Sequence, residues 1–376
     1  MSLKIRTEIS SLASRHQSGV AQYTNLLVEA LNARQGISVS GHYFDFLNRQ
    51  PSPSINIQTS VNKLIPLRVY AKLQSYNIAP PFDILQPKVD LTIFPNFATW
   101  PTARSSYSAA VIHDLTYIFH PEVVEEKNLH HLRRVVPRTI RSADFIITVS
   151  NSVKSEIVKE FNLNPENCIV TPIPPNKSFF KTISSERIGV VKEKYNINPR
   201  KKYIYFIGNF EPRKNLEVLI KAYSLLSQEV KSEYSLILAG GKGWKTEATQ
   251  KALNSAIQSG EDIKHIGFVD QKDSPALYQG ASLFVMPSLY EGFGMPVLEA
   301  MASGTPVVAS DIPVLREVGD TCATYADPQD PISFRNVIQE ALSNPRPTRS
   351  QLQKNATRYS WDDNVQKIID KVNALS

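Results

Sequence analysis

Strand-length apolar runs alternate with amphipathic segments along most of this chain. In the second half the runs are YIYFIGNF, SLILAG, HIGFV, SLFVMPS and PVVAS, and helical patterns fall near residues 215–230 and 246–260. The first half repeats the alternation more loosely, with strand-like runs at residues 4–9, 39–46, 91–95, 109–113 and 145–149. Alternating strands and helices predict parallel sheets with helices on both faces. We therefore expect an α/β protein built of doubly wound, Rossmann-like sheets.

Two breaks in this pattern divide the chain. A length of 376 residues is too long for one ordinary core and suits two domains. The paired prolines in IPPN forbid ladder hydrogen bonds and stiffen the chain, so we place the connection at residues 174–182. The expected domains are therefore residues 1–175 and 176–358. A helical stripe of apolar residues predicts a last helix in the remaining segment, 359–376.

One loop of the second half has the composition of an anion site. The segment Glu291-Gly-Phe-Gly-Met295 lies between the apolar run SLFVMPS and a helix-like segment that ends at a glycine. Gly292 and Gly294 lack side chains, so the backbone N–H groups of Phe293, Gly294 and Met295 can approach a phosphate at the helix N-terminus. We predict that this loop binds a diphosphate.

Two glutamates, Glu291 and Glu299, frame that loop. Eight positions on a helix correspond to about 12 Å of rise, more than the roughly 5 to 9.5 Å between the paired carboxylates of sugar hydrolases. We therefore do not interpret them as one acid/base pair. They can accept hydrogen bonds at opposite ends of an elongated donor, Glu291 from a sugar and Glu299 from a ribose. The alternative is a capping glutamate and a solvated helix face.

Four segments together resemble one enzyme family. The stretch EGFGMPVLEAMASGTPVVAS resembles the E-x7-E signature of the retaining glycosyltransferases of family 4, which have the GT-B fold. GNFEPRKN is similar to the family's G-x-x-x-x-x-K-N loop, whose basic pair grips the donor diphosphate and here is Arg213 and Lys214. VIHD resembles the strand end that carries a histidine near the transferred sugar, His113. SGV, with Ser18 and Gly19, resembles the first glycine loop, although the family usually shows two adjacent glycines there.

The resemblance implies two Rossmann-like domains that face each other across a cleft, with a last helix that crosses back to the first domain. It implies catalytic roles for Glu291, His113, Arg213 and Lys214, and an acceptor site near Ser18 and Gly19. The expected donor-binding residues are Gly208, Arg213, Lys214, Phe268, Val269, Gly292, Phe293, Gly294, Met295 and Glu299.

The basic pair has a chemistry suited to a departing nucleoside diphosphate. Arg213 offers a planar fork for phosphate and Lys214 a point charge, which together can stabilise the leaving group without a metal. The sequence has no Asp-x-Asp triad for a divalent cation, and we expect neither metal nor cofactor. The alternative is a solvated pair, because adjacent basic residues are common in surface loops. His113, at the end of a strand, is either a sugar contact or a structural hydrogen-bonding group.

A second glycine-rich segment, GGKGW at residues 240–244, fits neither phosphate-loop pattern. It has no G-x-x-x-x-G-K-[ST] spacing, and no G-x-G-x-x-G that opens a helix. We interpret it as lining the site near the nucleotide base, where the strand end with Phe268 and Val269 offers backbone groups.

Composition limits the partners and the location. No apolar run approaches the roughly 18 residues of a membrane span, and the segment MSLKIRTEISSL lacks the apolar stretch of a signal peptide. We expect a cytoplasmic protein with no cysteine site, since Cys168 and Cys322 lie in apparent strands of different halves. The net charge of +7 favours anionic partners. Residues 63–76 and 127–141 mix cationic and apolar side chains, which indicates either an anionic membrane at the inner face or an ordinary solvated helix face.

These observations predict a metal-independent retaining glycosyltransferase that moves a hexose from a nucleoside diphosphate to a glycan or lipid-linked acceptor. Likeness to mannosyltransferases of O-antigen-type surface polysaccharides favours GDP-mannose, although no residue distinguishes guanine from uracil. One alternative is a nucleotide-sugar epimerase of the same fold. Another is a non-catalytic cationic protein that binds glycans or nucleic acid. We expect no nucleic-acid partner for the transferase.

Overall fold

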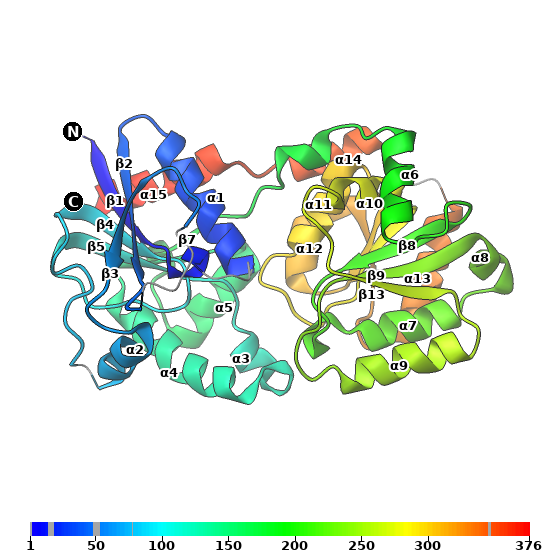
Figure 1. Cartoon of the computed structure of the whole chain (residues 1–376), viewed down its shortest axis with the longest axis horizontal. Helices are drawn as coiled ribbons and strands as arrows, with labels where there is room; N and C mark the ends of the chain where they lie inside the picture. The colour runs from blue at the N-terminus through cyan, green and yellow to red at the C-terminus, as the bar shows by residue number, and fades with distance from the viewer. Residues whose placement is uncertain (1, 14–18, 48–52, 77, 345–346) are drawn as a thin grey trace. The chain divides into compact units, whose positions relative to one another are not determined.

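The chain folds into two compact units. The computed structural model describes residues 2–13, 19–47, 53–76, 78–344 and 347–376 (Figure 1). The first unit comprises Met1–Leu115, Lys127–Ile173 and Ser360–Ser376, and the second comprises Thr116–Glu126 and Pro174–Tyr359. Segment 116–126 therefore groups with the second unit, although it lies inside the expected domain 1–175.

The first unit is built on a seven-stranded parallel sheet with the order β3-β2-β1-β4-β5-β6-β7. Its strands are β1 (Leu3–Glu8), β2 (Ile37–Phe44), β3 (Gln58–Asn62), β4 (Val89–Phe94), β5 (Ser105–Ile112), β6 (Phe145–Thr148) and β7 (Cys168–Val170). The last residues of strands β1, β4, β5 and β6 are buried, because helices cover both faces of the sheet.

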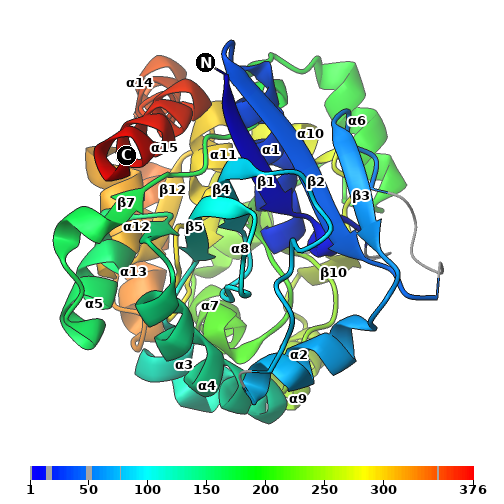
Figure 2. The same ribbon diagram turned by 90° about the vertical axis from the view of Figure 1, so that its left-hand side faces the viewer.

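Helices cover both faces of this sheet (Figure 1). They are α1 (Gly19–Ala33), α2 (Leu67–Ser75), α4 (Glu126–Ser142), α5 (Asn151–Phe161) and α15 (Trp361–Leu375), with single turns η1 (Ser10–Ala13) and η3 (Pro165–Asn167). The last helix, α15, lies beside β7 (Figure 2). Its residues Val365, Ile368 and Val372 are buried, and the Asn364 side chain donates to Pro172 O over 2.6 Å.

The second unit is built on a six-stranded parallel sheet with the order β10-β9-β8-β11-β12-β13. Its strands are β8 (Lys202–Ile207), β9 (Tyr234–Ala239), β10 (Ile263–Gly267), β11 (Leu283–Met286), β12 (Val307–Ser310) and β13 (Ala323–Ala326). The two parallel sheets confirm the predicted α/β class.

Helices also cover both faces of the second sheet, with α7, α9 and α13 on one side and α10, α11 and α12 on the other (Figure 1). The helices of this unit are α3 (Thr116–Phe119), α6 (Ser185–Lys194), α7 (Leu216–Ser224), α8 (Gln228–Glu233), α9 (Glu247–Gln258), α10 (Ser274–Gly280), α11 (Met295–Ser303), α12 (Pro313–Gly319), α13 (Pro331–Ser343) and α14 (Arg349–Ala356). Its single turns are η2 (Pro121–Val123), η4 (Lys177–Phe180), η5 (Pro212–Lys214) and η6 (Asp320–Cys322).

Several local expectations differ from the structure. The helix expected over 215–230 is two helices, because Ser227 accepts a hydrogen bond from Val230 N and starts α8 as a new helix. Cys322 lies in the turn η6 and is partly exposed, so it is not the strand residue that we expected. None of the described helices is long and apolar enough to cross a membrane.

Candidate functional site

The order of strands in the second unit reverses between β8 and β11. From β8 the chain continues to β9 and β10 on one side, whereas β11, β12 and β13 lie on the other. In open parallel sheets, ligands bind at the carboxyl ends of the strands at such a switch point. A ligand site is therefore expected at the loops that follow β8 and β11.

The loop after β8 carries Arg213 and Lys214. It forms the turn η5, and Asn215 then adopts the left-handed conformation with φ of 55° before α7 begins. Asparagine tolerates this conformation better than most residues. The Asn215 side chain donates to the carbonyl oxygens of Pro287 (3.0 Å) and Pro328 (2.7 Å). The first bond fixes the loop after β8 against the loop after β11, and the second fixes it against the loop after β13.

The loop after β11 leads into α11 through Gly294, whose φ is 94°. A Cβ atom here would lie 2.7 Å from Leu315 Cδ2, so the position needs glycine for both backbone and space. Among the described residues, no side chain caps the start of α11. An uncapped helix N-terminus is the kind of position that can bind an anion. The Phe293 ring is buried, and its centroid lies 5.4 Å from that of the Tyr359 ring. Only the backbone of Phe293 can therefore face a ligand.

The two loops meet in a buried cluster of charges. Lys214 Nζ lies 2.6 Å from Glu291 Oε1, and Arg213 Nη1 lies 2.6 Å from Glu291 Oε2. Arg213 also donates to Glu211 Oε1 (2.7 Å) and to the carbonyl oxygen of Tyr290 (2.9 Å). The structure therefore brings the adjacent residues Arg213 and Lys214 together with Glu291, which lies 77 positions after Lys214 in the sequence.

Burial and charge set the protonation of this cluster. Burial alone would raise the pKa of Glu291, but Arg213 and Lys214 outweigh it and lower that pKa to about 2. Burial lowers the pKa of Lys214, an effect that Glu291 opposes. At neutral pH the carboxylate is thus ionised and holds both cations at the switch point.

Glu299 lies apart from this cluster, in the second turn of α11. Its Oε2 accepts a hydrogen bond from the Tyr278 hydroxyl of α10 over 2.9 Å. Burial raises the pKa of Glu299 to about 7, and the Tyr278 bond opposes this only in part. A carboxyl group that changes charge near neutral pH can accept hydrogen bonds from hydroxyls when ionised and donate one when protonated.

The remaining donor candidates lie at the ends of β8, β9 and β10. Gly208 N donates to Ala239 O, and Gly240 N donates to Gly267 O. A Cβ on Gly240 would lie 1.9 Å from Gly208 O, so the first glycine of GGKGW allows strand ends to approach closely. Phe268 is 77% exposed and Val269 is buried. Their backbone role toward a base stays a prediction.

The candidates of the first unit lie at the ends of its strands. Nε2 of His113 donates to the carbonyl oxygen of Pro95 over 2.8 Å, and the ring packs edge-on against Tyr23. Burial lowers the pKa of His113, so the ring is neutral and Nδ1 is left as an acceptor. Gly19 opens α1, with nothing within 4 Å of an added Cβ. Ser18 lies outside the described residues.

Sequence reasoning missed three residues of the site. Glu211 and Asn215 hold Arg213 and the loop after β8, and Tyr278 holds Glu299. Glu211 and Asn215 stand inside the motif GNFEPRKN, which was a usable signal. Tyr278 lies in a helix with no motif, so nothing in the sequence marked it.

Residues 189–359 match the family model described as glycosyl transferases group 1. The chain carries a group 1 glycosyltransferase domain. This confirms the resemblance to glycosyltransferases seen in the sequence. The match includes Arg213, Lys214, Glu291 and Glu299.

Curated relatives of this group 1 domain include two proteins of Escherichia coli. One, named O-antigen chain mannosyltransferase B, is 41% identical over 140 residues, which are 37% of this chain and 36% of that protein. The other, named serotype-specific mannosyltransferase WbdA, is 34% identical over 175 residues, which are 45% of this chain and 21% of that protein. The matches span less than half the length of these relatives.

A solved structure shares the fold of the whole chain. Sucrose-phosphate synthase from Thermosynechococcus elongatus aligns with a TM-score of 0.73 and 19% identity, covering 99% of both chains. With the two parallel sheets and the group 1 domain, this likeness identifies the GT-B fold.

Proposed function

We propose that this protein is a retaining glycosyltransferase that moves a mannosyl group from a nucleoside diphosphate to an acceptor hydroxyl. The observation that carries this proposal is the joint placement of Arg213, Lys214 and Glu291 at the switch point of the second sheet. The names of the two E. coli relatives support mannose as the hexose.

The charge cluster suggests how the donor binds. A diphosphate offers Arg213 and Lys214 charged oxygens in place of the Glu291 carboxylate, and the N-terminus of α11 adds backbone donors. Glu291, released from the cations, can then accept hydrogen bonds from sugar hydroxyls. Glu299 accepts from the ribose at the other end of the donor. The diphosphate therefore frees the carboxylate that holds the sugar.

The proposed chemistry needs no metal. Arg213 and Lys214 stabilise the negative charge that develops on the leaving diphosphate, and they are already positioned before reaction. In a retaining transfer the acceptor oxygen attacks from the side that the diphosphate leaves, and a phosphate oxygen takes the hydroxyl proton. His113, neutral and with Nδ1 as an acceptor, orients a sugar hydroxyl in this scheme.

The acceptor belongs to the first unit in this proposal, near Gly19 and His113. The relative named O-antigen chain mannosyltransferase B favours a growing bacterial surface glycan or its lipid-linked precursor. GDP-mannose is the donor that we propose, from the same likeness.

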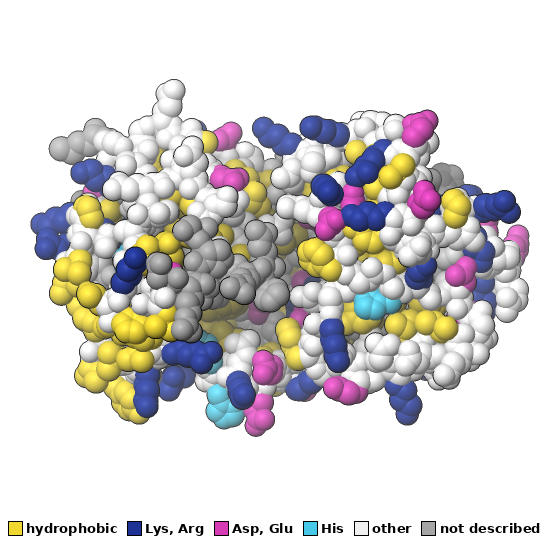
Figure 3. Space-filling view, viewed as in Figure 1, with side chains coloured by type: hydrophobic (Ala, Val, Ile, Leu, Met, Phe, Trp, Pro, Cys, Tyr) yellow, Lys and Arg dark blue, Asp and Glu magenta, His cyan; other side chains and the backbone are white. Residues whose placement is uncertain are grey.

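We also propose that the first unit attaches to the inner face of an anionic membrane. Large apolar side chains are exposed around α2, and Figure 3 shows a hydrophobic patch there with Lys and Arg beside it. The exposed apolar residues are Leu64, Leu67, Val69, Tyr76, Ile78, Ile84 and Leu85. Apolar side chains flanked by cations are the composition of an interfacial surface.

Nucleotide binding and product analysis test the transferase proposal. GDP should raise the melting temperature of the protein more than UDP, ADP or dTDP, because a ligand that binds the folded state stabilises it by mass action. With labelled GDP-mannose and a mannose-terminated oligosaccharide, we expect an extended product with an α linkage by NMR. A changed sugar nucleotide without acceptor would indicate an epimerase instead. Polyanion binding with no donor turnover would indicate a binding protein.

A further inference from the structure

The first unit contains its own pocket at the point where its strand order reverses. Strands β1 and β4 pair in parallel, and the sheet continues through β2 on one side and β5 on the other. A pocket with a volume of about 640 Å³ lies where β1 and β4 end, lined by Glu8 of β1 and by Asn96 just after β4. This volume is in the usual range for small-molecule sites, and ligands of open parallel sheets bind at such a position.

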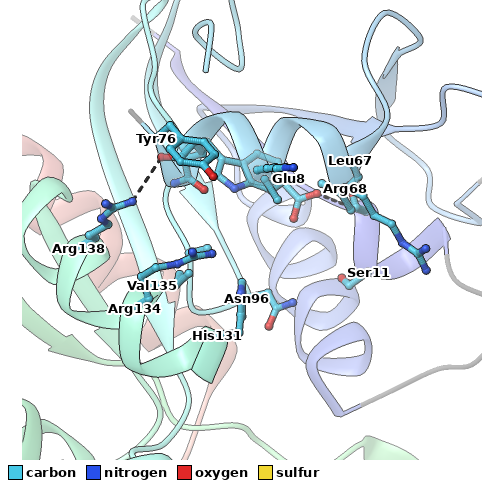
Figure 4. A pocket seen from close by; sticks show the side chains of 16 residues that line it. Glu8, Ser11, Leu67, Arg68, Tyr76, Asn96, His131, Arg134, Val135 and Arg138 are labelled. Atoms are coloured by element: carbon cyan, nitrogen blue, oxygen red, sulfur yellow. Dashed lines mark hydrogen bonds between the residues drawn. The ribbon is translucent and has the colours of Figure 1, made fainter. Parts of the chain in front are cut away.

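The carboxyl group of Glu8 is a buried polar group at this pocket (Figure 4). Glu8 is 6% exposed, and its Oε1 accepts a hydrogen bond from Ser10 N over 2.8 Å. Among the described residues, none donates to the other carboxyl oxygen, Oε2. Burial raises the pKa of Glu8 to about 7, and the bond from Ser10 opposes this only in part. A hydroxyl of a ligand can therefore bond to Oε2 whether the carboxyl group is ionised or protonated.

The other polar groups of the pocket are of mixed kind. Figure 4 shows Glu8 and Ser11 on one side of Asn96, and Arg134 on the other. The Ser11 hydroxyl donates to Thr24 Oγ1 over 3.3 Å, which leaves its oxygen as an acceptor. An amide both donates and accepts, whereas a guanidinium only donates. Hydroxyls can bond to all of these groups, but a phosphate only accepts and is repelled by an ionised carboxylate. The mixture favours an uncharged ligand rich in hydroxyls.

One part of the pocket lining is aromatic. Trp100 lines the pocket and is partly exposed. Its ring packs edge-on against the rings of Phe44 and Tyr70, with centroid distances of 5.1 and 5.4 Å. The Tyr70 hydroxyl donates to Pro80 O over 2.7 Å, so this neighbour is itself held in place. An indole fixed in this way offers a flat apolar surface, and the C–H face of a sugar ring can stack on it.

The pocket adjoins the residues already expected to meet the acceptor. The carbonyl oxygen of Pro95 accepts the hydrogen bond from His113 Nε2 over 2.8 Å, and Asn96 is the next residue in the chain. The turn η1, which carries Ser11, packs against α1, the helix that begins at Gly19. The loop after β4 and the turn after β1 therefore connect this pocket to the predicted acceptor region of the same unit.

We propose that this pocket binds an uncharged sugar unit of the acceptor. Hydroxyls of the sugar bond to Glu8, Asn96 and Ser11. The apolar face of the sugar ring stacks on Trp100. This inference rests on the proposed function and narrows it, because it makes the recognised part of the acceptor a neutral saccharide and names the residues that select it.

Calorimetric titration of the full-length protein with mannotriose tests the pocket directly. The parent should bind mannotriose, and the double variant Glu8→Ala/Asn96→Ala should bind it at least about tenfold more weakly, because two hydrogen-bonding groups are lost. The control Asn128→Ala/Glu160→Ala removes the same side chains from exposed positions outside the pocket and should bind as the parent does.

Denaturation curves check that each variant is folded. If the double variant does not fold, the single variant Asn96→Ala, at an exposed position, takes its place and should weaken binding about fivefold. Three outcomes would overturn the inference: no binding of mannotriose by the parent, equal binding by the pocket variant and the control, or displacement of mannotriose by an equal concentration of inorganic phosphate.

Tryptophan fluorescence locates the bound sugar. Mannotriose should change the emission of the parent, and Trp100→Phe should abolish this change while it keeps an aromatic ring in the cluster. Trp244→Phe, in the second unit, is the matched control and should retain the change. A parent without any change, or an equal change in Trp100→Phe, contradicts stacking on this residue.

Transfer assays separate this inference from the transferase proposal. Glu8→Ala/Asn96→Ala should raise the KM for mannotriose as acceptor and leave the KM for GDP-mannose unchanged. If mannose is transferred and the acceptor KM of this variant equals that of the parent, the pocket inference fails and the transferase stands. If no nucleotide sugar is bound or turned over, the transferase proposal fails, while the titration still reports on the pocket.

Discussion

The ammonium of Lys214 and the carboxylate of Glu291 form an ion pair of 2.6 Å in which both side chains are at least nine-tenths buried. This ion pair joins the loops that follow β8 and β11. It therefore holds the site residues in place and also stabilises the fold of the second unit. Losing one member of a buried pair is more harmful than lacking both, because the remaining charge has no partner.

Glu291→Gln should therefore lower the free energy of unfolding by about 3 kcal/mol, since Lys214 would stay charged and buried. Urea denaturation measures this. Glu247→Gln, at an exposed position in the first turn of α9, is the matched control and should stay within about 0.5 kcal/mol of the parent. Equal stability of the two variants would show that the ion pair does not stabilise the unit.

Arg213→Ala should reduce turnover about 100-fold, if the guanidinium supplies about 3 kcal/mol to the developing diphosphate charge. Initial rates at saturating donor measure this. Arg200→Ala, at an exposed arginine with no ion pair among the described residues, should keep the parental rate. A near-parental rate for Arg213→Ala would remove the arginine from the proposed mechanism.

Glu299 should make nucleotide binding depend on pH. Its folded pKa of about 7 lies above the ordinary glutamate value of 4.5, so folding favours the protonated form. The free energy of unfolding therefore falls as pH rises from about 4.5 to 7. Ribose hydroxyls that donate to the carboxylate favour its charged form. GDP should thus bind more tightly as pH rises through this range.

The second phosphate ionisation of GDP falls in the same range, so Glu299→Gln serves as the reference. The pH dependence of the GDP dissociation constant should be steeper in the parent than in Glu299→Gln, because only the phosphate titrates in the variant. Identical profiles for the two proteins would argue against contact between Glu299 and the nucleotide.

Gly240→Ala should destabilise the second unit by about 3 kcal/mol or more. Its φ is 132°, and a Cβ would lie 1.9 Å from the carbonyl oxygen of Gly208. At Gly241 the nearest atom would be 3.5 Å away, at the end of the Asn209 side chain. Gly241→Ala should therefore be nearly neutral in the same thermal or urea measurement. If both variants melt alike, the close approach of these strand ends is not required.

Membrane attachment should depend on apolar residues near α2. Leu64→Asp/Ile78→Asp should weaken binding to phosphatidylglycerol vesicles at low salt by about tenfold or more, since each apolar side chain contributes about 1.5–3 kcal/mol when buried. Val190→Asp/Ile257→Asp changes two exposed apolar residues of the second unit and is the control. Cosedimentation with the vesicles measures the binding of both double variants. A parent protein that stays in the supernatant would end the membrane proposal.

The general fold could be predicted from the sequence because buried parallel strands are continuous apolar runs. The runs YIYFIG and SLFVM mark the two strands at the switch point, and the loops after them carry the motif residues. Edge strands were harder to predict from the sequence. β3, QTSVN, is polar and partly exposed, so it lacks the apolar signal that marks a central strand.

Contacts across the sequence could not be predicted in the same way. The sequence indicated that Glu291 and Lys214 belong to one site, but not that they form a direct ion pair. The cationic segments 63–76 and 127–141 were also recognised, yet their convergence on Glu8 depends on how α2 and α4 pack. Tertiary packing decides such contacts, and single-residue patterns carry little information about it.

The last helix of the first unit, α15, is formed by residues 361–375, which the ribosome makes after the whole second unit. A ribosome releases the strands of the first sheet early, but β7 and α1 are covered by that helix only after residues 361–375 have left the ribosome. The second unit is contiguous from Pro174 to Tyr359 apart from one short segment, so it can mature sooner. Nascent chains stalled before residue 360 should therefore expose an unfinished amino-terminal unit to chaperones and proteases.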